Sequence, residues 1–183
     1  MTYAEKLMLR DGREAVIRPA EGEDAPRMLK YMKQMLGETP FLIRTPEEFD
    51  YTAEEEAAIL DRIKNDPRCL MLIVEADGEI VACADISSSS SKSRVRHLAN
   101  LGISVRKDFW KLGIGSALME RLISFAKEHE VEQVELGVVA ENRRAMNLYM
   151  KYGFTVYGTR PHAIRYADGS YADEYLMYKR LSE

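Results

Sequence analysis

The segment Leu98–His129, which reads LANLGISVRKDFWKLGIGSALMERLISFAKEH, decides the fold of this chain. Its first eight residues place apolar side chains at every second position, which predicts a buried strand from Leu98 to Val105. A basic turn follows and ends in Gly113-Ile114-Gly115. Beyond it, apolar residues recur with the period of an amphipathic helix, at Ile114, Ala117, Leu118, Leu122, Phe125 and Ala126.

A glycine turn between a strand and a helix is typical of an anion-binding site. Unpaired backbone N–H groups and the positive end of the helix dipole converge there, and glycine lets a phosphate approach the backbone. Two common nucleotide motifs do not fit. The dinucleotide fingerprint needs a third glycine where Leu118 stands, and a Walker loop needs a Gly-Lys-Ser/Thr ending that is absent here.

Two motifs resemble the GNAT superfamily of N-acetyltransferases. The superfamily signature Arg/Gln-x-x-Gly-x-Gly/Ala is matched at both glycines by the segment from Trp110 to Gly115, and Trp110 departs from the signature at its first position. Asn142–Phe154 is similar to a second superfamily segment, Asn-x-x-Ala-x-x-Leu-Tyr-x-x-x-Gly-Phe, at the expected distance. Two motifs in the right order are more specific than either alone, and the resemblance extends over Glu14–Leu181.

The resemblance implies one α/β domain that spans residues 1–183. We expect a mixed, mostly antiparallel sheet of about seven strands with helices on both faces, in the order β-α-α-β-β-β-α-β-α-β-β. The strand Leu98–Val105 and the strand Gln133–Val139 would run parallel and splay apart at the cofactor site. Fold class and domain organisation are therefore expectations that a structure can test.

The periodicity of the remaining sequence places the other helices. Apolar spacing predicts a helix over Glu23–Leu36 and a second from a Thr52 cap to about Asn65. The intervening Gly37–Tyr51 has two prolines and no clean period, so we expect a loop. The serine run Ser87–Ser91 also predicts a loop.

A hairpin is expected at Asp77-Gly78, since this dipeptide favours a two-residue turn. A turn there pairs Leu72 with Cys83 and Cys69 with Ile86. The two cysteines would then point to opposite faces of the sheet, which excludes a disulfide between them.

By resemblance, the cosubstrate is acetyl-CoA, and no metal is implied. Its pantetheine arm would lie between the splayed strands and bond to the main chain near Ile103 and Val105. Its pyrophosphate would bind the N–H groups of the glycine turn, namely Lys111, Leu112, Gly113, Ile114, Gly115 and Ser116. Asn142 would cap the following helix and contact the CoA arm.

Acetyl transfer to an amine makes three chemical demands. The amine must lose a proton, because a lysine-like amine with a pKa near ~10.4 is mostly protonated at neutral pH. The oxyanion of the tetrahedral intermediate needs a donor, for which the N–H of Val105 would suit. The departing thiolate needs a proton, and the superfamily often uses a tyrosine at the position of Tyr149.

The general base is left open by the sequence. Superfamily members often carry a glutamate on the central strand, but Leu98–Val105 has no carboxylate. The candidates are His97, Asp85 and Glu174, or a water held by Asn100 or Ser104.

Composition and charge limit which partners and which cellular compartment are expected. The chain has 183 residues with 46% hydrophobic content and a net charge of −4, which suits one globular domain and argues against nucleic acid as a partner. No apolar run approaches the roughly 18–20 residues of a membrane span, and no signal-peptide segment is recognisable. We expect a cytoplasmic protein that does not act at a membrane, and the resemblance is compatible with a homodimer.

The acceptor is expected to be an amine, either a small molecule or a peptide N-terminus. Acids and aromatics in Gly37–Tyr51, including Phe41, are compatible with a cationic amine. The alternative function is a non-catalytic acyl-CoA sensor or interaction module. Such a module would keep the glycine turn and lose the thiolate donor, so the presence of Tyr149 favours the enzyme.

Overall fold

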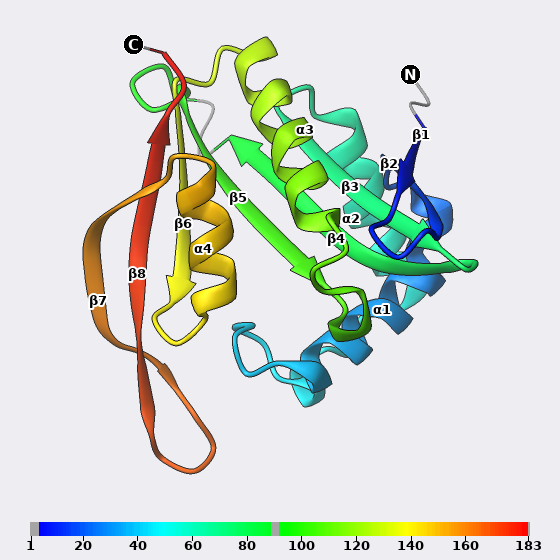
Figure 1. The fold of residues 1–183 in the computed structure, drawn as a ribbon, viewed down its shortest axis with the longest axis horizontal. Coiled ribbons are helices and arrows are strands. Elements are labelled where there is room, and N and C mark those ends of the chain that lie inside the picture. Colours follow the sequence, from blue (N-terminus) through cyan, green and yellow to red (C-terminus); the bar gives the residue numbers. More distant parts are fainter. Residues whose placement is uncertain (1–3, 89–91, 183) are drawn as a thin grey trace.

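The computed structural model describes residues 4–88 and 92–182. Within them, eight strands form one mixed sheet in the order β1-β2-β3-β4-β5-β6-β8-β7 (Figure 1). The strands are β1 (Glu5–Met8), β2 (Glu14–Pro19), β3 (Cys69–Ala76), β4 (Glu79–Ser88), β5 (Leu98–Val105), β6 (Gln133–Val139), β7 (Thr155–Arg165) and β8 (Tyr171–Arg180). The helices are α1 (Ala25–Glu38), α2 (Ala53–Asn65), α3 (Ile114–Glu128) and α4 (Arg143–Lys151). The expected order of elements is confirmed, with β1 as an additional edge strand.

The helices cover both faces of the sheet, as expected (Figure 1). Helices α3 and α4 pack on one face, where the larger apolar core includes Leu118, Leu122 and Phe154. Helices α1 and α2 pack on the other face, and α1 buries Met28 and its neighbours one and two turns later there. Met28 and Met35 of α1 are therefore core residues, whereas Met32 is half-buried.

The gap between β5 and β6 is the feature that positions the site. These two strands are parallel, but they pair only from Leu98 with Gln133 to Asn100 with Glu135. On its other side, β5 pairs with β4 along nearly its whole length. The Arg106 N–H donates to the Val81 carbonyl at 3.0 Å, which fixes the alternation of that ladder. The backbone groups of the odd-numbered residues of β5, Leu101, Ile103 and Val105, consequently face the gap.

The hairpin of β3 and β4 corrects one prediction. Its turn lies at Asp77-Gly78, and both residues have positive φ, 53° and 79°. A bulge after Val74 shifts the register, so Cys83 pairs with Ile73 and lies on the same face as Cys69. The prediction of opposite faces was wrong because the bulge was not foreseen. Both cysteines are free, since four residues along a strand separate them by about 13 Å.

The predicted helix boundaries hold to within two residues. The Thr52 hydroxyl accepts from the Glu55 N–H at 3.2 Å and the Glu55 carboxylate accepts from the Thr52 N–H at 2.9 Å. Helix α2 then ends at Asn65. Helix α1 runs two residues beyond the predicted Leu36, and the loop after it contains a short 3₁₀ turn at Pro46–Glu48. In the serine run, Ser87 and Ser88 belong to β4, and Ser89–Ser91 lie outside the described residues.

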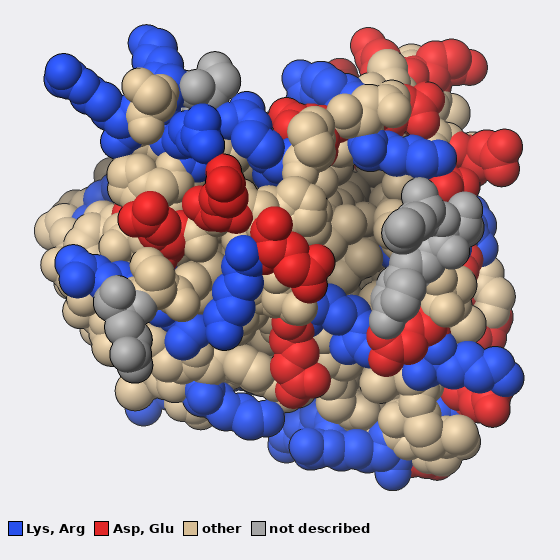
Figure 2. Space-filling model, turned by 90° about the horizontal axis from the view of Figure 1, so that it is seen from above, with Lys and Arg blue, Asp and Glu red and all other residues tan. Residues whose placement is uncertain are grey.

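Charge and hydropathy add two observations. Lys and Arg side chains are interspersed with Asp and Glu on the face seen in Figure 2. No helix among residues 4–88 and 92–182 combines the length and the apolar character that a membrane crossing requires.

Candidate functional site

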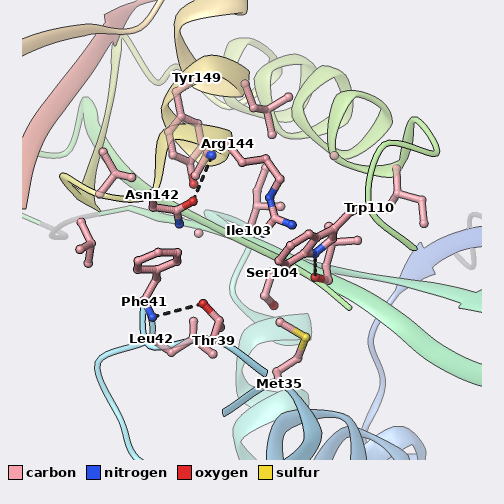
Figure 3. Close-up of a pocket in the computed structure, with 18 of the residues that line it drawn as sticks. Met35, Thr39, Phe41, Leu42, Ile103, Ser104, Trp110, Asn142, Arg144 and Tyr149 are labelled. Atoms are coloured by element: carbon pink, nitrogen blue, oxygen red, sulfur yellow. Dashed lines mark hydrogen bonds between the residues drawn. The ribbon is translucent and has the colours of Figure 1, made fainter. Parts of the chain in front are cut away.

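A cavity of about 580 Å³ passes through the gap between β5 and β6. It reaches from the N-terminus of α3 to the end of α1 and the loop that follows, and Figure 3 shows its lining side chains. Nine of the sequence-predicted cofactor residues line it: Ile103, Val105, Lys111, Gly113, Ile114, Gly115, Ser116, Asn142 and Tyr149. The predicted Leu112 does not, because its side chain packs against the apolar core.

The glycine turn has the backbone geometry of an anion cradle. Gly113 has φ +99°, a conformation that L side chains rarely adopt, and α3 begins at the next residue. The first intrahelical bond runs from the Ala117 N–H to the Gly113 carbonyl at 3.1 Å. The N–H groups from Ile114 to Ser116 precede that bond and have no helical acceptor. Gly115 serves packing, since a Cβ there would lie 3.1 Å from Leu148.

Helix α4 presents Asn142 and Tyr149 to the cavity (Figure 3). The Asn142 side chain accepts from the Ala145 N–H at 3.2 Å, so it is the N-cap that the sequence predicted. Tyr149 is only 6% exposed. Burial, and after it the Asp85 charge, raise its pKa while Arg144 opposes the rise, with a net pKa of about 12. Its hydroxyl is therefore protonated at neutral pH, and it makes no hydrogen bond with another described residue.

Trp110 and Arg144 form one wall of the cavity. The Trp110 indole N–H donates to the Val105 carbonyl at 2.7 Å, which satisfies the last carbonyl of β5 (Figure 3). The Arg144 guanidinium carbon lies 3.1 Å from the centre of the Trp110 ring. Burial lowers the pKa of Arg144. Trp110 stands where the superfamily signature has Arg or Gln, and its ring stacks with an arginine of α4.

Two carboxylates flank the gap on the face covered by α1 and α2. Asp85 of β4 leans over Gly102 of β5, where a Cβ would lie 2.9 Å from its Oδ1. Glu174 of β8 leans over Gly137 of β6 in the same way, and a Cβ there would collide with its Oε1. The glycine on each of the splayed strands thus makes room for an acid from its outer neighbour.

The two acids differ in their partners. Arg160 Nη1 lies 2.9 Å from Glu174 Oε2, although that oxygen receives no well-aligned hydrogen bond from a described residue. The Asp85 side chain makes no ion pair with a described residue, and burial raises its pKa to about 6. Asp85 acts electrostatically on Cys83 of its own strand and on Tyr149 across the gap. Glu56 of α2 also acts on Cys83.

His97 lies at the other end of β5. Its carbonyl accepts from the Glu132 N–H at 2.9 Å, where β5 and β6 still pair. The cavity lining on this strand starts only at Leu101. Six residues of extended chain, roughly 20 Å, separate His97 from Ile103. The structure does not bring His97 together with the other predicted residues, because the gap opens at the C-terminal end of the strand.

Some lining residues were not foreseen. Arg10 comes from the turn between β1 and β2, and Arg144 comes from α4. The Asp11-Gly12 pair beside Arg10 was an available turn signal.

Apolar side chains from α1 and the following loop close the end of the cavity that is far from α3: Met32, Met35, Leu36, Phe41 and Leu42. Of the other base candidates, Glu174 and Ser104 line the cavity, whereas Asn100 does not and Asp85 lies behind the lining residue Gly102. No group of side chains suited to a metal occurs in the described part of the chain.

Comparison with known proteins identifies the family of this chain. A family model described as the acetyltransferase (GNAT) family matches residues 29–154. The chain belongs to this family. It is 31% identical, over 168 residues that cover 90% of this chain and 96% of the relative, to the L-amino acid N-acetyltransferase AaaT of Escherichia coli strain K12.

Solved structures of acetyltransferases have the same fold. The acetyltransferase of the GNAT family from Streptococcus pneumoniae matches with a TM-score of 0.86 and 29% identity, over 91% of this chain and 99% of that one. The putative acetyltransferase yncA from Salmonella typhimurium, solved with its cofactor acetyl-CoA, matches with a TM-score of 0.79 and 20% identity, over 92% and 95%. Family and fold expectations are confirmed.

Proposed function

We propose that this GNAT family member transfers the acetyl group of acetyl-CoA to a primary amine. The main support for this proposal is the path of the cavity through the molecule. A single cavity joins the N-terminus of α3 to the hydroxyl of Tyr149 and runs along the gap-facing edge of β5. The acetyl-CoA bound in the structure of the Salmonella protein supports the choice of cosubstrate.

The residues present fit acetyl-CoA. The glycine turn offers N–H groups without helical acceptors to a diphosphate, and the positive φ of Gly113 keeps side chains away from it. The gap-facing N–H and carbonyl of Ile103, and the lone pair of the Val105 carbonyl that Trp110 leaves open, can bond amide groups of a pantetheine arm as a neighbouring strand would. Acetyl-CoA supplies an activated thioester whose thiol is a good leaving group.

The chain's own residues meet the chemical demands in the following way. Tyr149 holds a proton next to the gap and donates it to the departing thiolate. The Val105 N–H, which faces the gap, is the donor for the oxyanion. We assign the base to Asp85 instead of His97. Asp85 is half-buried against Gly102, which lines the cavity, has no ion-pair partner among the described residues and changes protonation near pH 6.

The acceptor enters from the face of α1 and α2. That end of the cavity combines the carboxylate of Glu174 with apolar side chains such as Met35 and Phe41. This lining favours an amine with an apolar body, and Glu174 is the counter-charge for its ammonium form. Free L-amino acids are the first acceptors to test, since the similar E. coli protein is named for them. Peptide N-termini are the second.

A turnover assay tests the proposal. The protein is incubated with acetyl-CoA and a panel of L-amino acids, their amides, polyamines and short peptides. Released CoA is measured together with the mass of the acetylated product. We expect turnover with at least one class of primary amine. Binding of acetyl-CoA without turnover of any acceptor would contradict the enzyme and favour the sensor.

A further inference from the structure

We infer that Arg10, in the turn between β1 and β2, binds the diphosphate of the CoA moiety. This inference rests on the proposed function and extends the cofactor site to the N-terminal hairpin. The hairpin lies outside residues 29–154, which the family model matches. Arg10 is thus a contribution of this chain that the family match does not include.

The backbone of this turn is fixed against the glycine turn. Leu9 is 2% exposed and belongs to the core under α3. The Leu9 N–H donates to the Arg13 carbonyl at 2.8 Å, and the Gly12 N–H donates to the Leu9 carbonyl at 3.0 Å, which closes the turn. The Arg10 N–H donates to the Leu112 carbonyl at 3.2 Å. The position of Arg10 relative to Gly113 is therefore set by main-chain bonds.

The guanidinium of Arg10 has no counter-charge within the described residues. The acid of its own turn, Asp11, is occupied by Arg13, whose Nε and Nη2 donate to Asp11 Oδ2 at 3.0 and 2.8 Å. Arg13 Nη1 also donates to Asp77 at 3.1 Å. The Arg10 side chain makes no hydrogen bond or ion pair with a described residue. Its Nε lies 4.0 Å from the point that a Cβ of Gly113 would occupy.

The charge balance at this end of the cavity calls for such a cation. A diphosphate brings two negative charges, and a helix N-terminus contributes only about half a positive charge. Lys111 of the glycine turn lines the cavity, and Lys151 Nζ lies 3.2 Å from Ser116 Oγ. A guanidinium is suited to the remaining oxygens, because its planar fork binds phosphate with two parallel hydrogen bonds. Arg10 is the cation with such a fork that lies next to Gly113.

Ligand truncation in two variants tests the inference. Dissociation constants of CoA, dephospho-CoA and acetyl-pantetheine are measured by calorimetry for the parent, Arg10→Ala and Arg10→Lys. We expect Arg10→Ala to weaken both CoA and dephospho-CoA about tenfold, as the loss of a charge-assisted bond predicts, and Arg10→Lys to weaken them less. Binding of acetyl-pantetheine, which lacks the diphosphate, should stay within about twofold.

The matched control is the double variant Asp11→Ala/Arg13→Ala, which removes the paired acid and arginine of the same turn together and leaves no free carboxylate beside Arg10. It should leave CoA binding within about twofold of the parent, and melting temperatures report whether each variant is folded. Unchanged CoA binding in Arg10→Ala, an equal loss in the double variant, or an equal loss for acetyl-pantetheine would overturn the inference. A loss confined to CoA would assign Arg10 to the 3′-phosphate and overturn the diphosphate assignment. A parent that does not bind CoA would instead refute the proposed function.

Discussion

At the scale of single residues, Tyr149 is the group on which the proposed chemistry depends most. Its hydroxyl is protonated, buried beside the gap and without a hydrogen bond to a described residue. Tyr149 lies on the face of α4 that is turned toward the sheet, which explains why its side chain is buried and why its hydroxyl points into the cavity. Because no protein bond is lost, removal of this hydroxyl separates catalysis from stability.

Tyr149→Phe should lower kcat by about 100-fold, the low end of general-acid effects, because a thiolate is a fair leaving group. The dissociation constant of acetyl-CoA should hardly change, and the melting temperature should hardly fall. Steady-state kinetics and calorimetry check this. Tyr152→Phe is the control, since its hydroxyl bonds the Ser116 carbonyl at 3.1 Å and the Glu120 carboxylate at 2.8 Å. It should cost stability and little kcat. Full kcat in Tyr149→Phe would make Tyr149 a packing residue.

Asp85 predicts how the rate depends on pH. Its pKa of about 6 means that the basic form appears as pH rises through 6, so kcat/KM should rise there. Asp85→Asn should remove this limb of the profile and lower the rate, while His97→Ala should leave both unchanged. A profile of Asp85→Asn that matches the parent would exclude Asp85 as the base.

The same residue links activity to stability. A carboxyl whose pKa is raised by folding stabilises the native state fully below its unfolded value, and this contribution is lost as pH rises toward 6. The ionised Asp85 therefore costs the fold up to about 3 kcal/mol at neutral pH. Asp85→Asn should melt higher than the parent at pH 8 and close to it at pH 4. Thermal melts at the two pH values test the sign.

At the scale of elements, strong local sequence patterns were sufficient to predict helices and turns. The glycine turn, the Thr52 capping box and the period of α3 predicted their elements within two residues, because each depends on contacts inside one segment. The β3–β4 register and the strand β1 were missed. The first depends on a bulge after Val74, and the second depends on pairing with β2.

The site divides in the same way. Residues of the glycine turn were predicted because a single motif carries them, and their role in binding stays a prediction. His97 lies away from the cavity, because the sequence does not tell at which end of β5 the strands separate, and its role as a base is untested. The pairing of Asp85 with Gly102 and of Glu174 with Gly137 joins neighbouring strands. Such contacts depend on the register between strands and could not be predicted from the sequence.

Gly113→Val tests the turn as an element. Its φ of +99° and its place beside the phosphate path both exclude a side chain, so the dissociation constant of CoA should rise at least about tenfold. Gly169→Val is the control. It has φ +85° in a turn where a Cβ meets nothing within 4 Å, so the backbone strain is similar but the cavity is distant. Equal CoA affinity in the two folded variants would refute the placement of the diphosphate.

Gly137→Ala tests the carboxylate of Glu174. The new methyl group would collide with Glu174 and displace it, so KM for the amine should rise about tenfold while acetyl-CoA affinity stays the same. Gly158→Ala is the matched strand variant, because its Cβ would make only ordinary contact with Leu176 at 3.6 Å. An unchanged amine KM in Gly137→Ala would remove Glu174 from the acceptor site.

At the scale of the whole molecule, the cavity draws on β5, α1, α3, α4 and the N-terminal turn. Ligand binding should therefore stabilise the folded state as a unit. At a concentration 100 times its dissociation constant, acetyl-CoA should raise the melting temperature by about 5–10 °C. Scanning calorimetry with and without the ligand checks this, and a melting temperature that acetyl-CoA leaves unchanged would contradict binding.

The gap between β5 and β6 also has a consequence for solubility. An unpaired strand edge normally recruits strands from other molecules and promotes aggregation. Here the open edge of β5 lies inside the molecule, with β6 and β8 continuing the sheet beyond it. Helix α4 lies over one side, and the end of α1 closes the other. Because this edge lies within the sheet and not at its border, a strand of another molecule cannot extend the sheet there. A small extended ligand that enters the cavity can still bond to the edge, so the unpaired backbone does not carry the aggregation hazard of a surface edge.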